Sequence, residues 1–363
     1  MQKKLIALAI AGLASTTAFA QSNVTVYGVM DASVDFTDSG DTAVLTSQRV
    51  TKVSSNQSRI GFKGSEDLGN GLKAIFQIET AINADGGATA SLNSRNTFVG
   101  LEGKNWGMVR VGQYDTPYKT ARIDYFGDHL GDHRNLMGAG KTSFDGRPAN
   151  TIRYDSPDMS GFDFALSYTA AAETAATTAV EEGEYWSASA KYKISSAWDI
   201  RASYERHEFG SAGSGTLAAA GGVVAGEAEK AWKIGTSYKS GPLRASFEYE
   251  SIDDDFSVAT TVERKAWTLG GGYTVGSNEF LIAYTVADDL DGISDTGGKQ
   301  WAIGMDHTLS KRTKLYAYYV DLTNDAAATF GLTGAGGNTT GGTAALGAGA
   351  DPSGFQFGVM HKF

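Results

Sequence analysis

The fold class of this chain is decided by the stretch Val24-Thr25-Val26-Tyr27-Gly28-Val29-Met30-Asp31-Ala32-Ser33-Val34-Asp35-Phe36. Its even positions are apolar or glycine, whereas its odd positions include Thr25, Asp31 and Asp35. Because successive side chains of a β-strand point to opposite faces, one face of this strand is apolar and the other is wet. The same alternation recurs in residues 162–168, 198–205 and 243–250. The sequence therefore predicts an all-β protein.

The lengths of the strands and of their connections favour a membrane barrel. A tilted strand of roughly ten residues crosses the hydrocarbon layer, and the alternating segments have about that length. Short turns alternate along the chain with long polar stretches: 66–71, 239–242 and 276–278 against 206–227 and 324–353. Such an asymmetry between the two rims is typical of outer-membrane barrels. The alternating segments number about sixteen, and an antiparallel barrel of that size holds a water-filled channel.

The N-terminal residues have the organisation of a secretory signal peptide. A basic start is followed by an apolar run and then by small residues: Lys3, Lys4, 5–13, Ala18 and Ala20. We therefore expect residues 1–20 to be removed and residues 21–363 to form one barrel domain. The apolar run is too short to span a bilayer, and no later stretch approaches the roughly 20 apolar residues that a transmembrane helix needs.

Composition excludes several classes of function. The chain has no Cys, so no disulfide framework and no thiolate metal site or nucleophile is available. Its 31 Lys and Arg residues stand against 41 Asp and Glu residues, and a formal charge of −10 disfavours nucleic-acid binding by phosphate neutralisation. The 46 Gly, 16 Tyr and 17 Phe residues suit strands, tight turns and aromatic belts. We expect no cofactor, no metal and no catalytic residue.

The last predicted strand ends on an aromatic ring. Its apolar face carries Phe355, Phe357 and Val359, and the sequence stops at Phe363. A terminal aromatic side chain suits the girdle at the membrane interface.

Six motifs resemble those of general trimeric porins, above all the beta-proteobacterial, neisserial-like group of Gram-negative porins. They are SRIGFKG (58–64), EDLGNGLKA (66–74), RNTFVGL (95–101), WGMVRVG (106–112), NTIRYDSP (150–157) and HKF (361–363). The resemblance covers nearly the whole chain and is strongest before residue 170 and at the C-terminus. It implies a sixteen-stranded transmembrane antiparallel barrel, three per assembly, with a long third extracellular loop folded into the lumen.

The resemblance also implies the function of the protein and its partners. It implies a general diffusion porin of the Gram-negative outer membrane, through which ions and small hydrophilic solutes pass passively. The implied partners are two further copies of the chain, outer-membrane lipid and lipopolysaccharide, and the barrel-assembly machinery, which in this class of protein recognises a terminal residue such as Phe363. No nucleic-acid partner is expected.

The loop expected at the constriction spans residues 114–149, and it shows no strand-like alternation. Long loops without structure of their own are usually functional or disordered. In the family, basic residues of the wall face acidic residues of this loop. By position we expect the basic wall residues Arg59, Arg95, Arg153, Arg110 and Arg122 and the acidic loop residues Asp124, Asp145 and Asp128. A family motif at the loop tip, Pro-Glu-Phe-Gly, is absent, and residues 144–147 take its place.

Charge at the constriction should outweigh charge on distant loops, because salt screens fields over roughly 8 to 10 Å. We therefore hypothesise a slight anion preference through the arginines. Alternation places Arg59 on the face of Lys63 and places Arg110 opposite its apolar neighbours, whereas the inward direction of Arg95 depends on the resemblance alone.

Four alternatives are weaker. His129 and His133 lie four residues apart among carboxylates, but Gly131 disfavours the helix that would join them as metal ligands, and a polar loop is the simpler interpretation. The Gly-rich residues 331–342 lack the Gly-Lys-Ser/Thr ending of a phosphate loop. An adhesin or structural barrel without an open pore remains the second function class. A barrel enzyme would need a serine partner for His361, and none is evident.

Overall fold

The computed structural model describes residues 23–42, 46–86, 95–140, 144, 146–170, 184–208, 227–254, 262–332 and 347–363. The expected signal peptide, residues 1–20, and most of the long polar stretch 206–227 lie outside the described residues.

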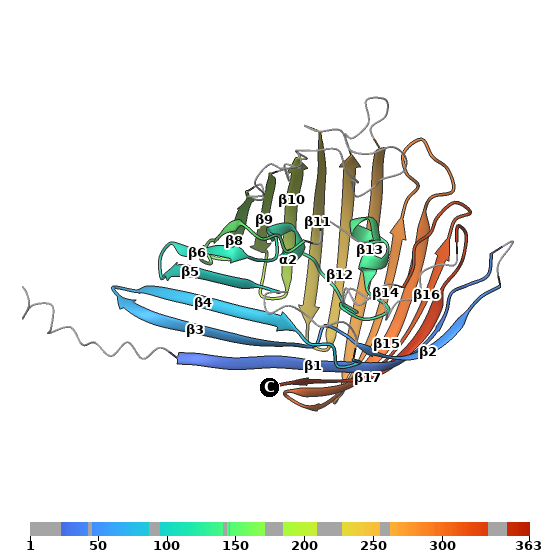
Figure 1. The fold of residues 1–363 in the computed structure, drawn as a ribbon, viewed down its shortest axis with the longest axis horizontal. Coiled ribbons are helices and arrows are strands. Elements are labelled where there is room, and N and C mark those ends of the chain that lie inside the picture. Colours follow the sequence, from blue (N-terminus) through green and yellow to red (C-terminus); the bar gives the residue numbers. More distant parts are fainter. Residues whose placement is uncertain are drawn as a thin grey trace, which may run out of the picture.

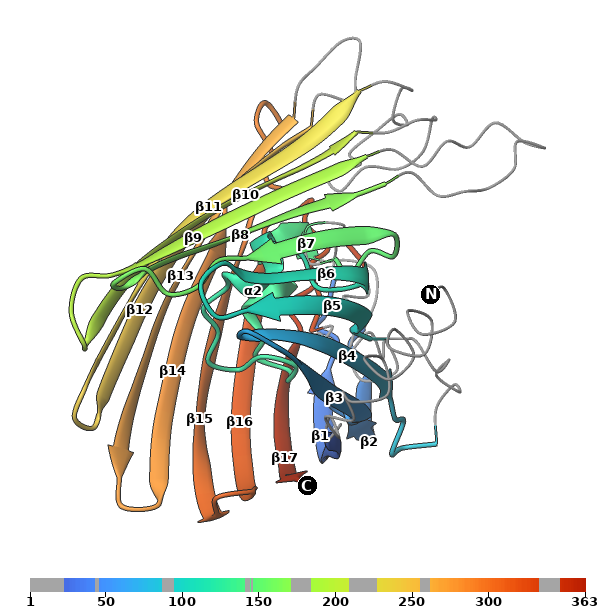
Figure 2. The same cartoon turned by 90° about the vertical axis from the view of Figure 1, so that its left-hand side faces the viewer.

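The chain forms one antiparallel sheet (Figure 1). Its strands are β1 Asn23–Asp38, β2 Arg49–Ser55, β3 Arg59–Gly69, β4 Leu72–Ala81, β5 Thr97–Gly103, β6 Gly107–Gln113, β7 Thr151–Asp155, β8 Phe162–Thr169, β9 Tyr185–Lys193, β10 Trp198–Glu208, β11 Ala228–Ser240, β12 Leu243–Asp254, β13 Val262–Val275, β14 Asn278–Ala287, β15 Gly298–Ser310, β16 Thr313–Asn324 and β17 Ser353–Lys362. Figure 2 shows that β10 and β11 rise well above β5, β6 and β7.

The sheet closes on itself at β1. On one side β1 pairs with β17, where Ala32 lies opposite Val359. On its other side β1 pairs first with β3 and then with β2. These two strands are therefore halves of one barrel strand, interrupted at residues 56–58, where Gln57 has a positive φ of 60°. Counting them once gives a closed barrel of sixteen strands and confirms the predicted fold class.

The alternation of the sequence separates the two faces of the barrel wall. Apolar side chains such as Val24 and Val99 are 58% and 62% exposed, which places them on the outer face. Polar side chains of the other parity, such as Asp31 and Glu250, are buried inside the barrel. An outer face of apolar groups is stable only in lipid, so the wall is built to cross a membrane.

The connections at one rim are tight hairpins. At the turn between β3 and β4, Asn70 and Gly71 both have positive φ, 53° and 77°, which is the conformation of a type I′ turn. The described helices are short: α2 Pro117–Thr120, and the 3-10 helices η1 His133–Asn135 and η2 Met137–Gly140. None of the described helices is long and apolar enough to cross a membrane.

Candidate functional site

Residues 114–149 are here called the inner loop, and their described part leaves the wall after β6 and packs against its inner face. α2 and the loop that follows lie within the ring of strands (Figure 1). The loop binds wall residues of the polar, inward parity, including Asp31 of β1, Glu250 of β12 and Gln300 of β15. The prediction that this loop folds into the lumen agrees with these contacts.

Local capping explains how two of the three described helical turns of the inner loop, α2 and η1, begin. The hydroxyl of Thr116 accepts a hydrogen bond from the backbone N–H of Lys119 at 3.2 Å, and Pro117 occupies the first turn, where no N–H is needed. Before η1, the carboxylate of Asp132 accepts the N–H of Arg134 at 2.9 Å. Side chains at both caps thus replace hydrogen bonds that the short turns cannot make themselves.

Four glutamates of β10 to β12 are covered by the inner loop, and we call them the carboxylate wall: Glu205, Glu229, Glu248 and Glu250. Each is at most 3% exposed. The hydroxyl of Tyr118 donates to Glu250 at 2.7 Å, and the N–H of Gly138 donates to the same carboxylate at 2.6 Å. Burial, and then the charge of Glu250, raise the pKa of Tyr118 well above its ordinary value. The loop therefore supplies hydrogen-bond donors to charges that it removes from water.

Contacts between uncharged groups attach the inner loop to β15, β16 and β17. The amide of Asn135 donates to Gln300 at 2.6 Å, and the N–H of Leu130 donates to Gln356 of β17 at 3.2 Å. Phe126 packs edge-on against Tyr318, with ring centroids 5.1 Å apart. Because these partners come from three strands, the loop is attached to the wall along much of its course.

Two histidines of the inner loop lie against carboxylates. Nε2 of His129 is 3.2 Å from Oδ2 of Asp31. Nδ1 of His133 is 3.5 Å from Asp124, and its Nε2 is 3.9 Å from Glu248. Burial would lower the pKa of both imidazoles, but the adjacent carboxylates outweigh it, and both pKa values are raised from 6.5. These contacts therefore stabilise the loop fully below about pH 6.5 and lose that contribution as the pH rises through the raised values.

Two of the predicted arginines meet at one carboxylate. Nε of Arg95 donates to Glu79 at 2.5 Å, and Nε of Arg59 lies 4.0 Å from the same carboxylate. Arg95 also donates to the side chain of Gln57, in the interruption between β2 and β3, and Tyr27 donates to Glu79 at 2.8 Å. Arg95 precedes β5 rather than lying in it, which is why strand parity could not give its direction.

The other two wall arginines share Asp155. Arg110 of β6 and Arg153 of β7 are register partners, and both bind the carboxylate of Asp155. Arg110 also stacks on Tyr114, its guanidinium 3.9 Å from the ring centroid. Arg153 donates to the backbone carbonyl of Asp115 at 2.6 Å, so it fixes the start of the inner loop to the wall. Both arginines are buried.

The placement of Arg122 on the wall was wrong. It lies in the inner loop, 3.6 Å from Asp124, because the chain has left the sheet at that point and has no strand parity. Asp124 and Asp128 make their ion pairs with cations of the loop, His133 and Arg134. Burial alone would raise the pKa of Asp124, but His133 and Arg122 hold it well below its usual range. Asp145 lies outside the described residues.

Among the described residues, one group has the spacing of metal ligands. Side-chain atoms of Asp124, Asp132 and His133 lie within 4.8 Å of one another. Arg134 contacts Asp132 at 2.7 Å, and Arg122 lies beside Asp124, so guanidinium groups already form ion pairs with both carboxylates. This donor set does not suit a divalent cation, which would have to displace them.

Sequence reasoning did not identify the carboxylate wall as part of the site. The alternation did place Glu205, Glu248 and Glu250 on the wet face, and this was the available signal. It could not show which wet residues lie beneath a loop. Phe363 has the outward parity that was expected and is 42% exposed, whereas its role in insertion stays a prediction.

A closed sixteen-stranded barrel with an inward loop has the architecture of a porin-like channel. The family model described as Gram-negative porin matches residues 7–328. The chain belongs to the Gram-negative porin family. Outer membrane porin protein 32 of Delftia acidovorans is 32% identical over the full length of both chains. Major outer membrane protein P.IB of Neisseria lactamica is 29% identical, over 86% of this porin and 91% of the relative.

Solved structures agree with this assignment. A structure described as an anion-selective porin from Comamonas acidovorans superposes with a TM-score of 0.77 at 27% identity, over 94% of this chain and 100% of the other. A structure of OmpT from Vibrio cholerae gives a TM-score of 0.69 at 17% identity, which supports the fold alone. This porin is therefore a passive channel of the outer membrane, and its relatives are channel proteins rather than enzymes.

Proposed function

We propose that this porin passes ions and small hydrophilic solutes with a preference for anions, set by four arginines that we call the arginine cluster: Arg59, Arg95, Arg110 and Arg153. The observation that carries the proposal is a charge imbalance. Four guanidinium groups of this cluster share two carboxylates, Glu79 and Asp155. An excess of fixed positive charge at a narrow point of a pore favours anions.

Burial of the carboxylate wall supports the same sign. Glu248 and Glu250 are covered by the inner loop, whereas the side chain of Arg59 is 27% exposed. Charges beneath the loop act on a permeant ion through protein and are matched locally by donors such as Tyr118. The similarity to a porin described as anion-selective also supports the proposal.

Planar-bilayer recording across a KCl gradient tests the proposal. The parent is compared with the double variant Arg59→Ala, Arg95→Ala. At about 4 Å in a water-like medium a unit charge acts on an ion with about 1 kcal/mol, so the reversal potential should move clearly toward cation preference. A double variant Arg49→Ala, Arg206→Ala is the matched control, because it removes two positive charges at the outer ends of β2 and β10.

Each outcome has a distinct meaning. Open channels whose reversal potential is unchanged in the Arg59, Arg95 variant would contradict the role of the arginine cluster. The same shift in the control variant would mean that overall charge, and not the cluster, sets selectivity. A silent bilayer with folded protein would contradict the open pore and favour a structural or adhesive barrel.

We also propose a homotrimer whose subunits meet on the side of β17 and β1 to β7. Among the described strands, every exposed Trp or Tyr lies on β9 to β15: Trp186, Tyr192, Trp198, Tyr204, Trp232, Tyr238, Tyr273 and Trp301. These side chains form the girdles of a wall that faces lipid headgroups. The strands β1 to β7 and β17 expose Val, Ile, Leu, Met and Phe on their outer face instead, and the one exposed Trp described on this side, Trp106, lies in the turn between β5 and β6.

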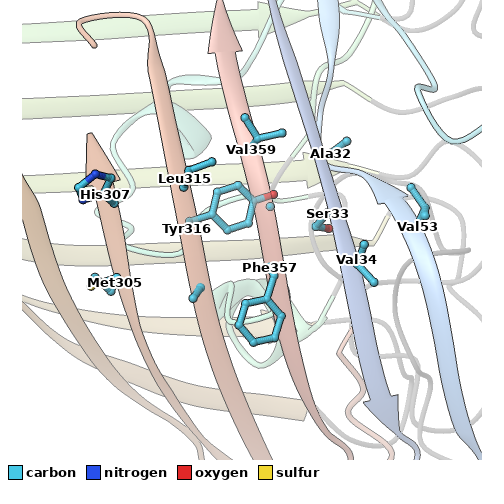
Figure 3. A pocket seen from close by; sticks show the side chains of 12 residues that line it. Ala32, Ser33, Val34, Val53, Met305, His307, Leu315, Tyr316, Phe357 and Val359 are labelled. Atoms are coloured by element: carbon cyan, nitrogen blue, oxygen red, sulfur yellow. The ribbon is translucent and has the colours of Figure 1, made fainter. Parts of the chain in front are cut away.

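An apolar hollow of about 640 Å³ lies at the edge of this second side, where its lining runs from β15 and β16 across β17 to β1 and β2 (Figure 3). Small side chains at Ala32 and Ala317 lie between larger ones such as Val53, Leu315 and Phe357. A side chain from a neighbouring subunit would fill it. In the recordings above, channels that appear in groups of three equal steps support the trimer, whereas single independent steps contradict it.

A further inference from the structure

A buried triad of ionisable side chains lies under the inner loop. Nδ1 of His207 is 2.6 Å from Glu229, and its Nε2 is 2.8 Å from Glu205. All three side chains are 0% exposed. His207 lies directly opposite Glu229 in the pairing of β10 with β11, so the contact is fixed by strand register.

The two contacts determine the number of protons in this triad. A neutral imidazole has one N–H and can donate to only one carboxylate. The lone pair of its second nitrogen would then face a lone pair of a carboxylate oxygen at hydrogen-bond distance, in a site closed to solvent. Both contacts are favourable only if the ring carries two protons, or if one glutamate carries the second. In either arrangement the triad holds one proton more than a neutral histidine between two carboxylates.

The inner loop rests on this triad through one ring. Phe144 stacks on His207, with centroids 4.4 Å apart and planes inclined by 16°. Phe144 is 1% exposed and also contacts Tyr118 of α2, at 5.8 Å between centroids. On its other side, His207 meets Tyr185 of β9 at 4.2 Å.

The charged groups around the triad come from the wall on each side. Glu205 and Glu229 bind the imidazole itself, and Glu250 lies beyond, bound to the hydroxyl of Tyr118. The ammonium group of Lys233 lies 4.1 Å above the ring of Tyr118. With three glutamates against one lysine, loss of the shared proton would add a further uncompensated negative charge to a fully buried site. Such a change is costly, so the side chains should rearrange.

We propose that His207, protonated between Glu205 and Glu229, is a positioning residue for the inner loop, and that loss of this proton releases Phe144 and changes the ion current. The inference rests on the proposed function, because it uses the inner loop as a boundary of the open pore. It assigns to His207 a role in the pore that does not depend on contact with the permeant ion.

Single-channel recording over about pH 6 to about pH 10 tests this proposal, a range that starts near the ordinary pKa of histidine. The parent should show steady currents at the acidic end and larger current fluctuations at the alkaline end. His207→Gln cannot hold the proton and should fluctuate over the whole range. His129 and His133 remain in both proteins, so the difference between the two profiles reports on His207.

Further variants separate positioning from simple loss of packing. His207→Arg keeps a planar cation at alkaline pH and should restore steady currents there. Glu229→Gln removes one carboxylate and should move the transition to lower pH by about one unit or more. Phe144→Leu leaves the triad intact and should behave as His207→Gln does. Glu208→Gln, next to His207 on β10 but half-exposed and bound to Arg206, is the matched control and should keep the profile of the parent.

The results that overturn the inference are specific. Channels that conduct, but whose pH profile is the same in the parent, His207→Gln and Phe144→Leu, would remove His207 from the positioning of the loop and leave the porin function intact. A silent bilayer for the folded parent would overturn the open pore and this inference together.

Discussion

Two sectors of the same barrel wall carry opposite charge and are treated differently by the fold. The arginine cluster lies on β3, β6 and β7 and just before β5, and it is stabilised by two carboxylates; Arg110 and Arg153 are buried, whereas Arg59 is still partly exposed. The carboxylate wall lies on β10 to β12 and is covered by the inner loop. The strand residues of both sectors face inward by the same alternation, so strand geometry alone does not distinguish them.

The difference shows that a pore can select ions by hiding charge as well as by presenting it. The chain as a whole is acidic, with a formal charge of −10. Net charge nevertheless says little about the constriction, because the inner loop removes four inward glutamates from water. The charge that acts on a permeant ion depends on which sector the inner loop covers. Detaching the loop should therefore change the ion current more than removing an exposed charge.

The largest effect is expected from Glu250→Ala. This change takes the acceptor from the hydroxyl of Tyr118 and from the N–H of Gly138, both of which are buried. An unsatisfied buried donor costs about 1–3 kcal/mol, so the loop should loosen and single-channel conductance should rise with added noise. Glu227→Ala, at an exposed position before β11, is the control. A conductance equal to that of the parent would show that the cover does not depend on this carboxylate.

A smaller effect is expected from a substitution within the arginine cluster, which should increase the anion preference. Glu79→Gln keeps an oxygen to accept hydrogen bonds from Arg95 and Tyr27, but it removes the negative charge between Arg59 and Arg95. Anion preference should increase roughly two- to five-fold, because a unit charge a few ångströms away acts with about 1 kcal/mol in a water-like medium. The reversal potential in a KCl gradient measures it. A shift toward cations would reverse the proposed sign of the cluster.

The smallest effect is expected between the two sectors, on β9. Lys191 pairs with Asp163 at 3.0 Å, and both side chains are about one-third exposed. Exposed pairs contribute about 0–1 kcal/mol, so Lys191→Met should change the denaturant midpoint little and leave the reversal potential where it was. If selectivity moved as far as in Glu79→Gln, the basic groups of β9 would have to be counted with the arginine cluster.

The fold could be predicted because each strand has one face toward lipid and the other toward water or polar protein. In β1, lipid on one side and water or polar protein on the other require the alternation from Val24 to Phe36, which is visible without any knowledge of neighbours. The barrel count followed from repeating this local pattern, and the structure confirmed it. The interruption at Gln57 was not visible, because two short strands in line with each other have the period of one.

The site was less predictable because its contacts are not local. Arg59 and Arg95 were predicted and do lie together at Glu79, but their part in selectivity stays a prediction. Arg122 was misplaced because parity has no meaning outside a strand. The inner loop has no period of its own, so nothing in the sequence shows that Tyr118 binds Glu250, 132 residues later.

The attachment of the inner loop has a consequence for how the barrel is made. Leu130 binds Gln356, 226 residues later, and its neighbour His129 binds Asp31 of the first strand. These two contacts use the first and last strands, which become neighbours only when the cylinder has closed. Contacts between residues so distant in sequence form late, because the chain between them must be ordered first. The interior of this porin is therefore expected to be empty during assembly and to receive its loop as a final step, so that a variant with a detached loop would still insert and close.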